Sequence, residues 1–128
     1  MENLTIAPTT STPRVDFDFE AGTLCLSGES HPEDVTEFYG PVMTAFGDWI
    51  DGLGTGACRF DFDFVYFNSS TAKIVMMLMD KLDEAAEGGA AVTIRWLYDP
   101  EDDNMLELGE EFGEDVTTAT LELVATEP

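Results

Sequence analysis

Residues 60–67 read Phe60-Asp61-Phe62-Asp63-Phe64-Val65-Tyr66-Phe67, and the polar run Asn68-Ser69-Ser70-Thr71 follows at once. The alternating start and continuously apolar end predict a central β-strand over residues 58–67, with its second half buried on both faces. Residues 71–87 carry apolar side chains at helical spacing and predict a helix. The junction places hydroxyl groups beside backbone N–H groups that lack an acceptor within the helix, which favours a phosphate there.

Further strands and helices are expected on both sides of this junction. Residues 15–19 and 23–27 alternate around a turn and predict a β-hairpin. Ser30 and Glu33 have the spacing of a capping box, so we expect Ser30 to be the N-cap of a first helix that ends near Gly52. The remaining elements predicted are a fourth strand at residues 91–98, a third helix at 102–112 and a last strand at 116–124.

The order of these elements predicts the fold class. Strands alternate with helices, which is typical of an α/β protein with a mixed β-sheet of about five strands and three to four helices packed against it. The length of 128 residues suits one domain, expected over residues 1–128. Residues 1–12 are rich in Thr, Ser and Pro and are expected to form an extended N-terminal arm.

The charge of the chain limits its partners. There are 27 Asp and Glu residues against five Lys and Arg, a formal net charge of −22. Such a chain has no basic stripe for nucleic acid or anionic lipid, so neither is expected as a partner. Solubility or adaptation to high salt explains the acidity, and an acidic face that steers a basic protein partner is a further explanation. No membrane helix or signal peptide is evident, so a cytoplasmic location is expected.

Residues with catalytic or metal-binding potential show weak patterns. Cys25 and Cys58 lie in apolar runs without metal-site spacing and are expected to be small buried residues. His31 has no acid–base partner identifiable by spacing. Asp61 and Asp63 share one strand face, which suits a metal or acid–base pair, but solvent-facing carboxylates are the simpler explanation. We therefore expect no cofactor, no bound metal and no catalytic activity.

Several separated motifs carry a resemblance to a known family. They are Ser11-Thr12-Pro13, Gly28-Glu29-Ser30-His31-Pro32-Glu33, Tyr66-Phe67-Asn68-Ser69-Ser70, Trp96-Leu97-Tyr98-Asp99 and Glu110-Glu111-Phe112. In this order they resemble the SiaC family of bacterial regulatory phosphoproteins. The strand, hydroxyl cluster and helix are also similar to the STAS domain of anti-sigma factor antagonists. The resemblance implies a STAS-like sheet.

The resemblance to SiaC implies a partner switch without catalysis of its own. In that family a partner kinase phosphorylates the protein and a PP2C-type phosphatase removes the phosphate. The unphosphorylated form binds and activates a diguanylate cyclase, which raises cyclic di-GMP and links the family to biofilm regulation. The modified hydroxyl follows the Asn of the Tyr-x-Asn motif and falls on Ser69, where the family usually has Thr. Ser70 and Thr71 are the less favoured acceptors.

The expected partner surface surrounds this position. It comprises Tyr66, Asn68, Ser69, Ser70 and, if its side chain is exposed, Met76. Judged from the local sequence alone, an unmodified helix cap is the better explanation of Ser69, and the resemblance is what favours a phosphorylation site. Two other functions stay open: an anti-sigma factor antagonist acting on an anti-sigma kinase, and a small acidic ligand-binding domain or enzyme that uses the carboxylates of the third strand.

Overall fold

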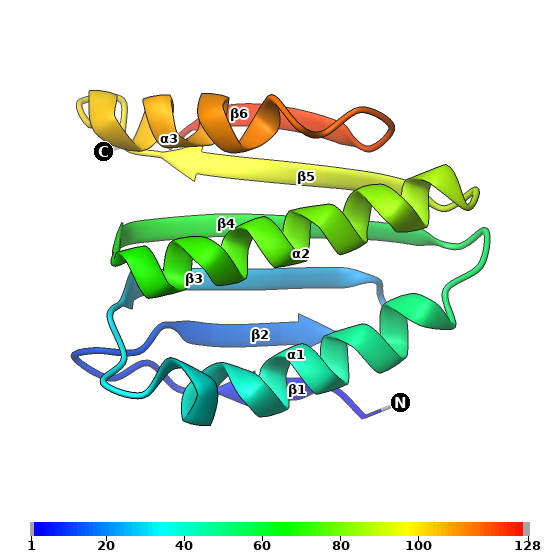
Figure 1. Ribbon diagram of the computed structural model, residues 1–128, viewed down its shortest axis with the longest axis horizontal. Coiled ribbons are helices and arrows are strands. Elements are labelled where there is room, and N and C mark those ends of the chain that lie inside the picture. Colours follow the sequence, from blue (N-terminus) through cyan, green and yellow to red (C-terminus); the bar gives the residue numbers. More distant parts are fainter. Residues whose placement is uncertain (1, 127–128) are drawn as a thin grey trace.

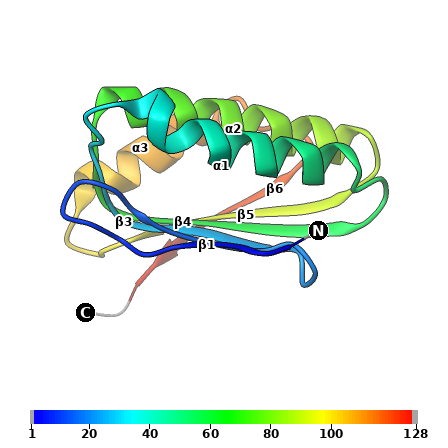
Figure 2. The same cartoon turned by 90° about the horizontal axis from the view of Figure 1, so that it is seen from below.

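The computed structural model describes residues 2–126, which form two layers, a six-stranded sheet and three helices on one of its faces (Figures 1 and 2). No helix of residues 2–126 covers the other face of the sheet. The elements in chain order are β1 (Leu4–Ile6), β2 (Arg14–Asp18), β3 (Thr23–Ser30), α1 (Val35–Asp51), β4 (Ala57–Phe67), α2 (Ser69–Glu87), β5 (Ala91–Tyr98), α3 (Asp103–Gly113) and β6 (Thr120–Ala125).

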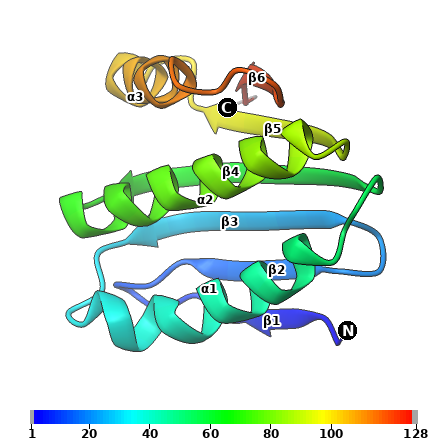
Figure 3. The same cartoon turned by 45° about the vertical axis from the view of Figure 1, so that its right-hand side comes forward.

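The strands lie in the sheet in the order in which they occur in the chain. β1, β2 and β3 are antiparallel neighbours, whereas β3, β4, β5 and β6 run parallel. Each parallel pair is connected by one helix, so α1, α2 and α3 all begin at the edge where the parallel strands end. Figure 3 shows the starts of α1 and α2 at this edge.

The core lies between the sheet and the helices. Phe60 and Phe62 of β4 stack with ring centroids 4.5 Å apart, and Phe62 also lies 5.6 Å from the ring of Trp96 on β5. The fully buried residues that meet them from the helices are Tyr39, Val42, Phe46, Val75, Leu78 and Leu82. The predicted helical stripes therefore do face the sheet.

The predicted fold class is confirmed, and three details differ. The sheet has six strands because Leu4 and Ile6 of the expected arm pair with Phe17 and Val15 of β2. The second half of β4 is not buried on both faces: Val65 is 70% exposed and Tyr66 52% exposed, since all three helices of the described chain cover the same side. The last strand begins at Thr120 rather than at residue 116.

The start of α1 also differs from the prediction. Ser30 is not the N-cap but the last residue of β3, and its side chain is fully buried. Asp34 caps the helix instead, with its carboxylate accepting a hydrogen bond of 3.0 Å from the amide of Glu37. Within residues 2–126, the longest apolar helical stretches fall short of what crossing a membrane requires.

Candidate functional site

The site is the junction between β4 and α2. Asn68 is extended and caps α2, with its side-chain oxygen accepting a hydrogen bond of 2.9 Å from the amide of Thr71. The backbone amide of Asn68 donates a hydrogen bond of 3.0 Å to the carbonyl of Ser30, which connects the junction to the end of β3. Asn68 thus fills the cap position that the simpler interpretation gave to Ser69. Ser69 is the first helical residue and is exposed, while Ser70 is half-buried.

A cluster of buried hydroxyl groups lies beneath this first turn. The Ser30 hydroxyl lies 2.6 Å from the Tyr39 hydroxyl and 2.8 Å from the Thr71 hydroxyl, and Thr71 also donates to the Ser30 carbonyl at 3.1 Å. Burial raises the pKa of Tyr39 to about 12, although these hydrogen bonds lower it. The cluster joins β3, α1 and α2, and it keeps the Thr71 side chain out of solvent.

The electrostatic environment of Ser69 is unusual for this chain. The first turn of α2 contains no acidic residue, although the molecule has 27 of them. The amides of Ser69 and Ser70 lie in the first turn, where a helix offers no acceptor of its own, and they carry the positive end of the helix dipole. Lys73 is exposed one turn further on, at the spacing from Ser69 that lets side chains interact.

Of the other expected partner residues, Tyr66 and Met76 are both exposed. Tyr66 precedes the junction on β4, and its ring centroid lies 5.9 Å from that of His31. Met76 lies two turns along α2 from Ser69, and Met77 beside it is exposed to the same extent. Met79 is buried and packs into the core, so the methionines divide between core and surface.

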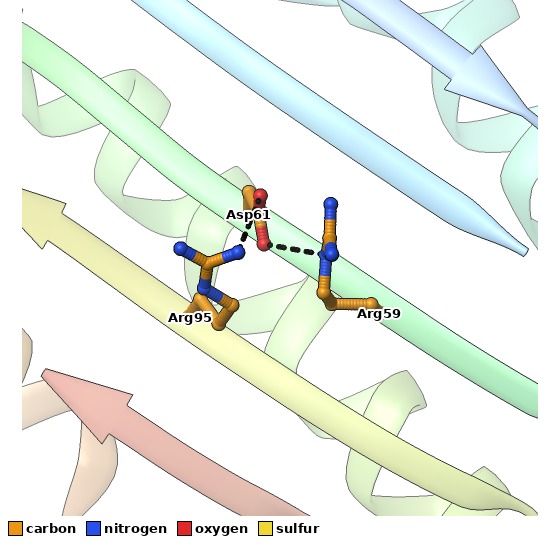
Figure 4. Close-up of polar contacts among 3 residues, drawn as sticks. All are labelled: Arg59, Asp61 and Arg95. Carbon is orange, nitrogen blue, oxygen red and sulfur yellow. Dashed lines mark ion pairs between the residues drawn. The ribbon is translucent and has the colours of Figure 1, made fainter. Parts of the chain in front are cut away.

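The carboxylates of β4 lie on the open face of the sheet. Figure 4 shows Asp61 between two arginines, with its oxygens 3.4 Å from Arg59 Nε and 3.6 Å from an Arg95 terminal nitrogen. Asp61 was expected to face solvent, but its side chain is only 14% exposed. Burial raises the pKa of Asp63, and the charge of Asp61 raises it further. Among residues 2–126 no group of three or more potential ligands is placed to hold a metal ion.

Both cysteines have free thiols. Cys58 is buried as expected, whereas Cys25 is half-buried on the open face of the sheet. Burial raises the pKa of Cys58 to about 12, and burial together with Asp61, Asp63 and Asp16 raises that of Cys25 to about 11. Since the thiolate is the reactive form, neither thiol is activated for nucleophilic chemistry.

Asp83 is a structural residue that the sequence interpretation missed. Its carboxylate accepts hydrogen bonds from the amides of Thr118 and Ala119, both at 2.8 Å, and from the amide and hydroxyl of Thr117, both at 3.1 Å. Burial raises the pKa of Asp83, but these hydrogen bonds outweigh it and leave the pKa lowered. The available signal was an acidic residue on the apolar stripe of α2, four residues after Met79 and eight after Val75.

Comparison with known proteins places this chain in a family. Residues 6–126 match the family described as SiaC family regulatory phosphoprotein. A relative from Pseudomonas aeruginosa strain UCBPP-PA14, named only as an uncharacterized protein, is 38% identical over 118 residues, which is 90% of each chain.

Solved structures agree with this match. The crystal structure of apo-SiaC from Pseudomonas aeruginosa has a TM-score of 0.89 and 35% identity, covering 98% of this chain and all of that one. A chain in the crystal structure of the diguanylate cyclase SiaD in complex with its activator SiaC, from the same organism, has a TM-score of 0.90 and 35% identity, covering 96% of this chain and 99% of that one. The protein described here therefore belongs to the SiaC family of regulatory phosphoproteins.

Proposed function

We propose that this protein is a non-enzymatic partner switch, in which phosphorylation of Ser69 controls binding to a diguanylate cyclase. Support for the cyclase comes from the similar structure in which SiaC is the activator of SiaD. The observation that carries the assignment of Ser69 is its exposed position in the only first turn, among the three described helices, that has no acidic residue.

The three hydroxyl residues of the junction differ in their access to a kinase. Ser69 is exposed, Ser70 is half-buried, and Thr71 is fully buried with its hydroxyl engaged by Ser30. A kinase must bring the acceptor oxygen into its own active site, so an engaged, buried hydroxyl is a poor substrate. This ranking favours Ser69 over Ser70 and places Thr71 last.

A phosphate on Ser69 has local partners in this chain. It brings a charge of about −1.5 to −2 and three acceptor oxygens. The free amides of the first turn of α2, the helix dipole and Lys73 all favour that charge. The fold therefore tolerates the modification, and its main effect falls on a partner surface that packs over Ser69 in the unphosphorylated state.

The switch needs two further partners, which the family resemblance supplies: a protein kinase and a PP2C-type phosphatase. We place all of them in the cytoplasm, where the ATP that the kinase uses is found. The chain itself contributes a docking surface at the end of β4 and the start of α2, formed by Tyr66, Asn68, Ser69, Ser70 and Met76.

Variants of Ser69 test the proposal directly. Calorimetry would measure their affinity for a candidate diguanylate cyclase from the same organism, and product formation would measure activation of that cyclase. We expect Ser69→Ala to bind and activate the cyclase like the untreated wild type, even after the variant has been treated with kinase and ATP. Ser69→Asp should bind about tenfold more weakly, or about 1.4 kcal/mol. Asn104→Asp, at an exposed first-turn position of α3 outside this surface, is the matched control and should bind within about twofold of the wild type. Equal binding by all variants, with kinase treatment having no effect on the wild type, would contradict the proposal.

A further inference from the structure

Strand β4 extends past the point where β5 stops pairing with it (Figure 1). The pairing of β5 with β4 ends at Phe62 and Trp96, whereas β3 stays paired with β4 up to Phe67. No described strand therefore pairs with residues 63–67 on the side toward β5. A strand edge that lacks a neighbour can accept an extended segment of another chain.

A groove of about 460 Å³ lies beside this free edge. Asp63, Phe64 and Val65 of β4 form one side, and the start of α3 with the segment before it forms the other. Asp63 and Val65 lie on the face of the sheet opposite the helices, since Phe62 and Phe64 point into the core and side chains alternate along a strand. Helices α1 and α2 contribute no residue to the lining.

The groove has an exposed apolar side chain at its centre. Val65 is 70% exposed, more than any other large apolar residue in the part of the chain that the structure describes. The pairing of β3 with β4 skips this residue, because Gly28 pairs with Phe64 and Glu29 with Tyr66. Val65 is thus the extra residue of a β-bulge, a feature that redirects a side chain away from the regular sheet.

The polar lining of the groove is acidic. It contains five carboxylates and no Lys or Arg. Asp99 and Asp102 are partly engaged, since they accept hydrogen bonds from the amides of Glu101 at 2.9 Å and Met105 at 3.0 Å. Asp63, Glu101 and Asp103 remain to face an occupant. A free strand edge, an apolar side chain and these charges together suit an extended basic segment of a protein.

We propose that this groove is a docking site for an extended segment of the partner kinase, in which Lys or Arg side chains flank an apolar one. The main chain of the segment adds to the free edge of β4, its apolar side chain covers Val65, and its cations face Glu101 and Asp103. This inference rests on the proposed function and adds a surface for the kinase on the face of the sheet opposite the helices.

The position of the groove suits a kinase better than the cyclase. Val65 lies four residues before Ser69, so a segment seated beside it brings the body of the kinase to the edge where α2 begins. A kinase must leave the acceptor hydroxyl free to meet ATP, and this groove does not cover Ser69. The cyclase, in the proposed function, packs over Ser69 itself and therefore uses a different surface.

A second copy of this chain does not supply such a segment. All five of its Lys and Arg residues already lie inside strands or helices: Arg14 in β2, Arg59 in β4, Arg95 in β5, and Lys73 and Lys81 in α2. A chain of net charge −22 is also repelled by the carboxylates of the groove. The occupant is therefore a different protein.

Two exposed strand residues provide a matched pair for the test. Val65 lines the groove, whereas Leu123 of β6 is exposed but lies outside it. The assay would measure initial rates of phosphate transfer from ATP to the intact chain, with a purified kinase from the same organism that phosphorylates the wild type on Ser69. Val65→Glu should raise the KM for this chain about tenfold and leave kcat unchanged. Leu123→Glu should stay within about twofold of the wild type. Circular dichroism would confirm that both variants are folded.

A second pair tests the charge of the occupant at a position far from Ser69 in the sequence. Glu101 and Glu110 are both exposed, and only Glu101 lines the groove. Glu101→Lys should raise the KM about fivefold at low salt and less at high salt, whereas Glu110→Lys, with the same change in net charge, should have little effect. Because Glu101 is not part of the sequence around the acceptor, a change in KM there reports docking through the fold.

The outcomes separate this inference from the proposed function. If candidate kinases place no phosphate on Ser69 of the wild type, the proposed function itself is wrong. If the wild type is phosphorylated and Val65→Glu and Glu101→Lys have the KM values of their controls, the groove inference is overturned while the proposed function stands. The inference is also overturned if these variants lose affinity for the cyclase and keep a normal KM with the kinase. A raised KM for both, with cyclase binding within about twofold of the wild type, supports the groove.

Discussion

Helices α1 and α2 begin side by side at the same edge of the sheet, after two paired strands, yet their first turns differ in charge. Both use the same backbone arrangement, with a side-chain oxygen accepting from the third amide of the helix, from Glu37 to Asp34 at 3.0 Å and from Thr71 to Asn68 at 2.9 Å. In α1 the cap is a carboxylate and Glu37 adds a second one. In α2 the cap is a neutral amide, and no acidic residue follows in the turn.

The two starts also differ in what lies beneath them. The third residue of α1, Glu37, is exposed to solvent, whereas the third residue of α2, Thr71, is buried and bonded to Ser30. The start of α2 is thus held firmly while its positive end is left without a negative charge. The two helix starts therefore share a capping geometry, but of these two only α2 is arranged to gain from a phosphate.

The largest expected effect comes from breaking the buried anchor. Thr71→Val removes the hydroxyl that bonds Ser30 and should lower the free energy of unfolding by about 2 kcal/mol, because buried polar groups lose a partner. Thr36→Val is the control in the first turn of α1, where the side chain is exposed, and should change stability by less than about 0.5 kcal/mol. Urea denaturation measures both, and equal effects would remove the distinction between the two starts.

The ionisation of Tyr39 tests whether the hydroxyl cluster beneath the start of α2 is buried. Because burial raises its pKa to about 12 in the folded state, the folded protein keeps a proton that the unfolded chain releases above pH 10. Stability from this group is complete below pH 10 and is lost as the pH rises toward 12, by about 1 kcal/mol between pH 9 and pH 11. Tyr39→Phe should abolish this part of the pH dependence in urea denaturation. Tyr66→Phe, at an exposed tyrosine, should retain it.

Exchanging the charges of the two caps tests the electrostatic difference. Asn68→Asp should stabilise the protein by about 0.3–1 kcal/mol at low salt, and Asp34→Asn should destabilise it by a similar amount. General repulsion in a chain of net charge −22 predicts the opposite sign for both. Thermal denaturation at low and high salt distinguishes the two, and the opposite signs would show that the helix dipole does not control this site.

The smallest expected effect concerns Lys73. In protein phosphorylated at Ser69, Lys73→Met should reduce the stabilisation from the phosphate by about 0.2–0.5 kcal/mol. It should also raise the pKa of the phosphoserine measured by phosphorus NMR, since a neighbouring cation favours the dianion. Lys81→Met, three turns from Ser69 on the same helix, should leave both quantities unchanged. Identical results for the two variants would show that Lys73 does not contact the phosphate.

Local patterns predicted most of the fold. The alternation in residues 15–19 and 23–27 and the apolar stripes of α1 and α2 reflect burial on one face, which a sequence shows directly. The pairing of β1 was missed because Leu4-Thr5-Ile6 is a short stretch within a polar-rich segment, and it becomes a strand only by bonding to Phe17 and its neighbours. The sixth strand of the sheet is therefore a tertiary effect.

The site was predicted in part. The apolar spacing placed the helix start at Thr71, two residues after its observed first residue Ser69, and the modification of Ser69, which the family motifs imply, stays a prediction. Ser30 was assigned to a cap because its spacing to Glu33 fits one, while its hydroxyl in fact bonds Tyr39 and Thr71. Thr71 is 41 residues away from Ser30 along the chain, so no local pattern reveals that contact.

Site-resolved mass spectrometry would show which hydroxyl group at the start of α2 carries the phosphate. The protein would be isolated from its native cells, and separately incubated with its partner kinase and ATP, and the phosphate on residues 69–71 would be located by fragmentation. We predict phosphate on Ser69 and none on Thr71. Phosphate confined to Ser70, or none on this turn under either condition, would contradict the account and leave the start of α2 as an uncharged helix cap.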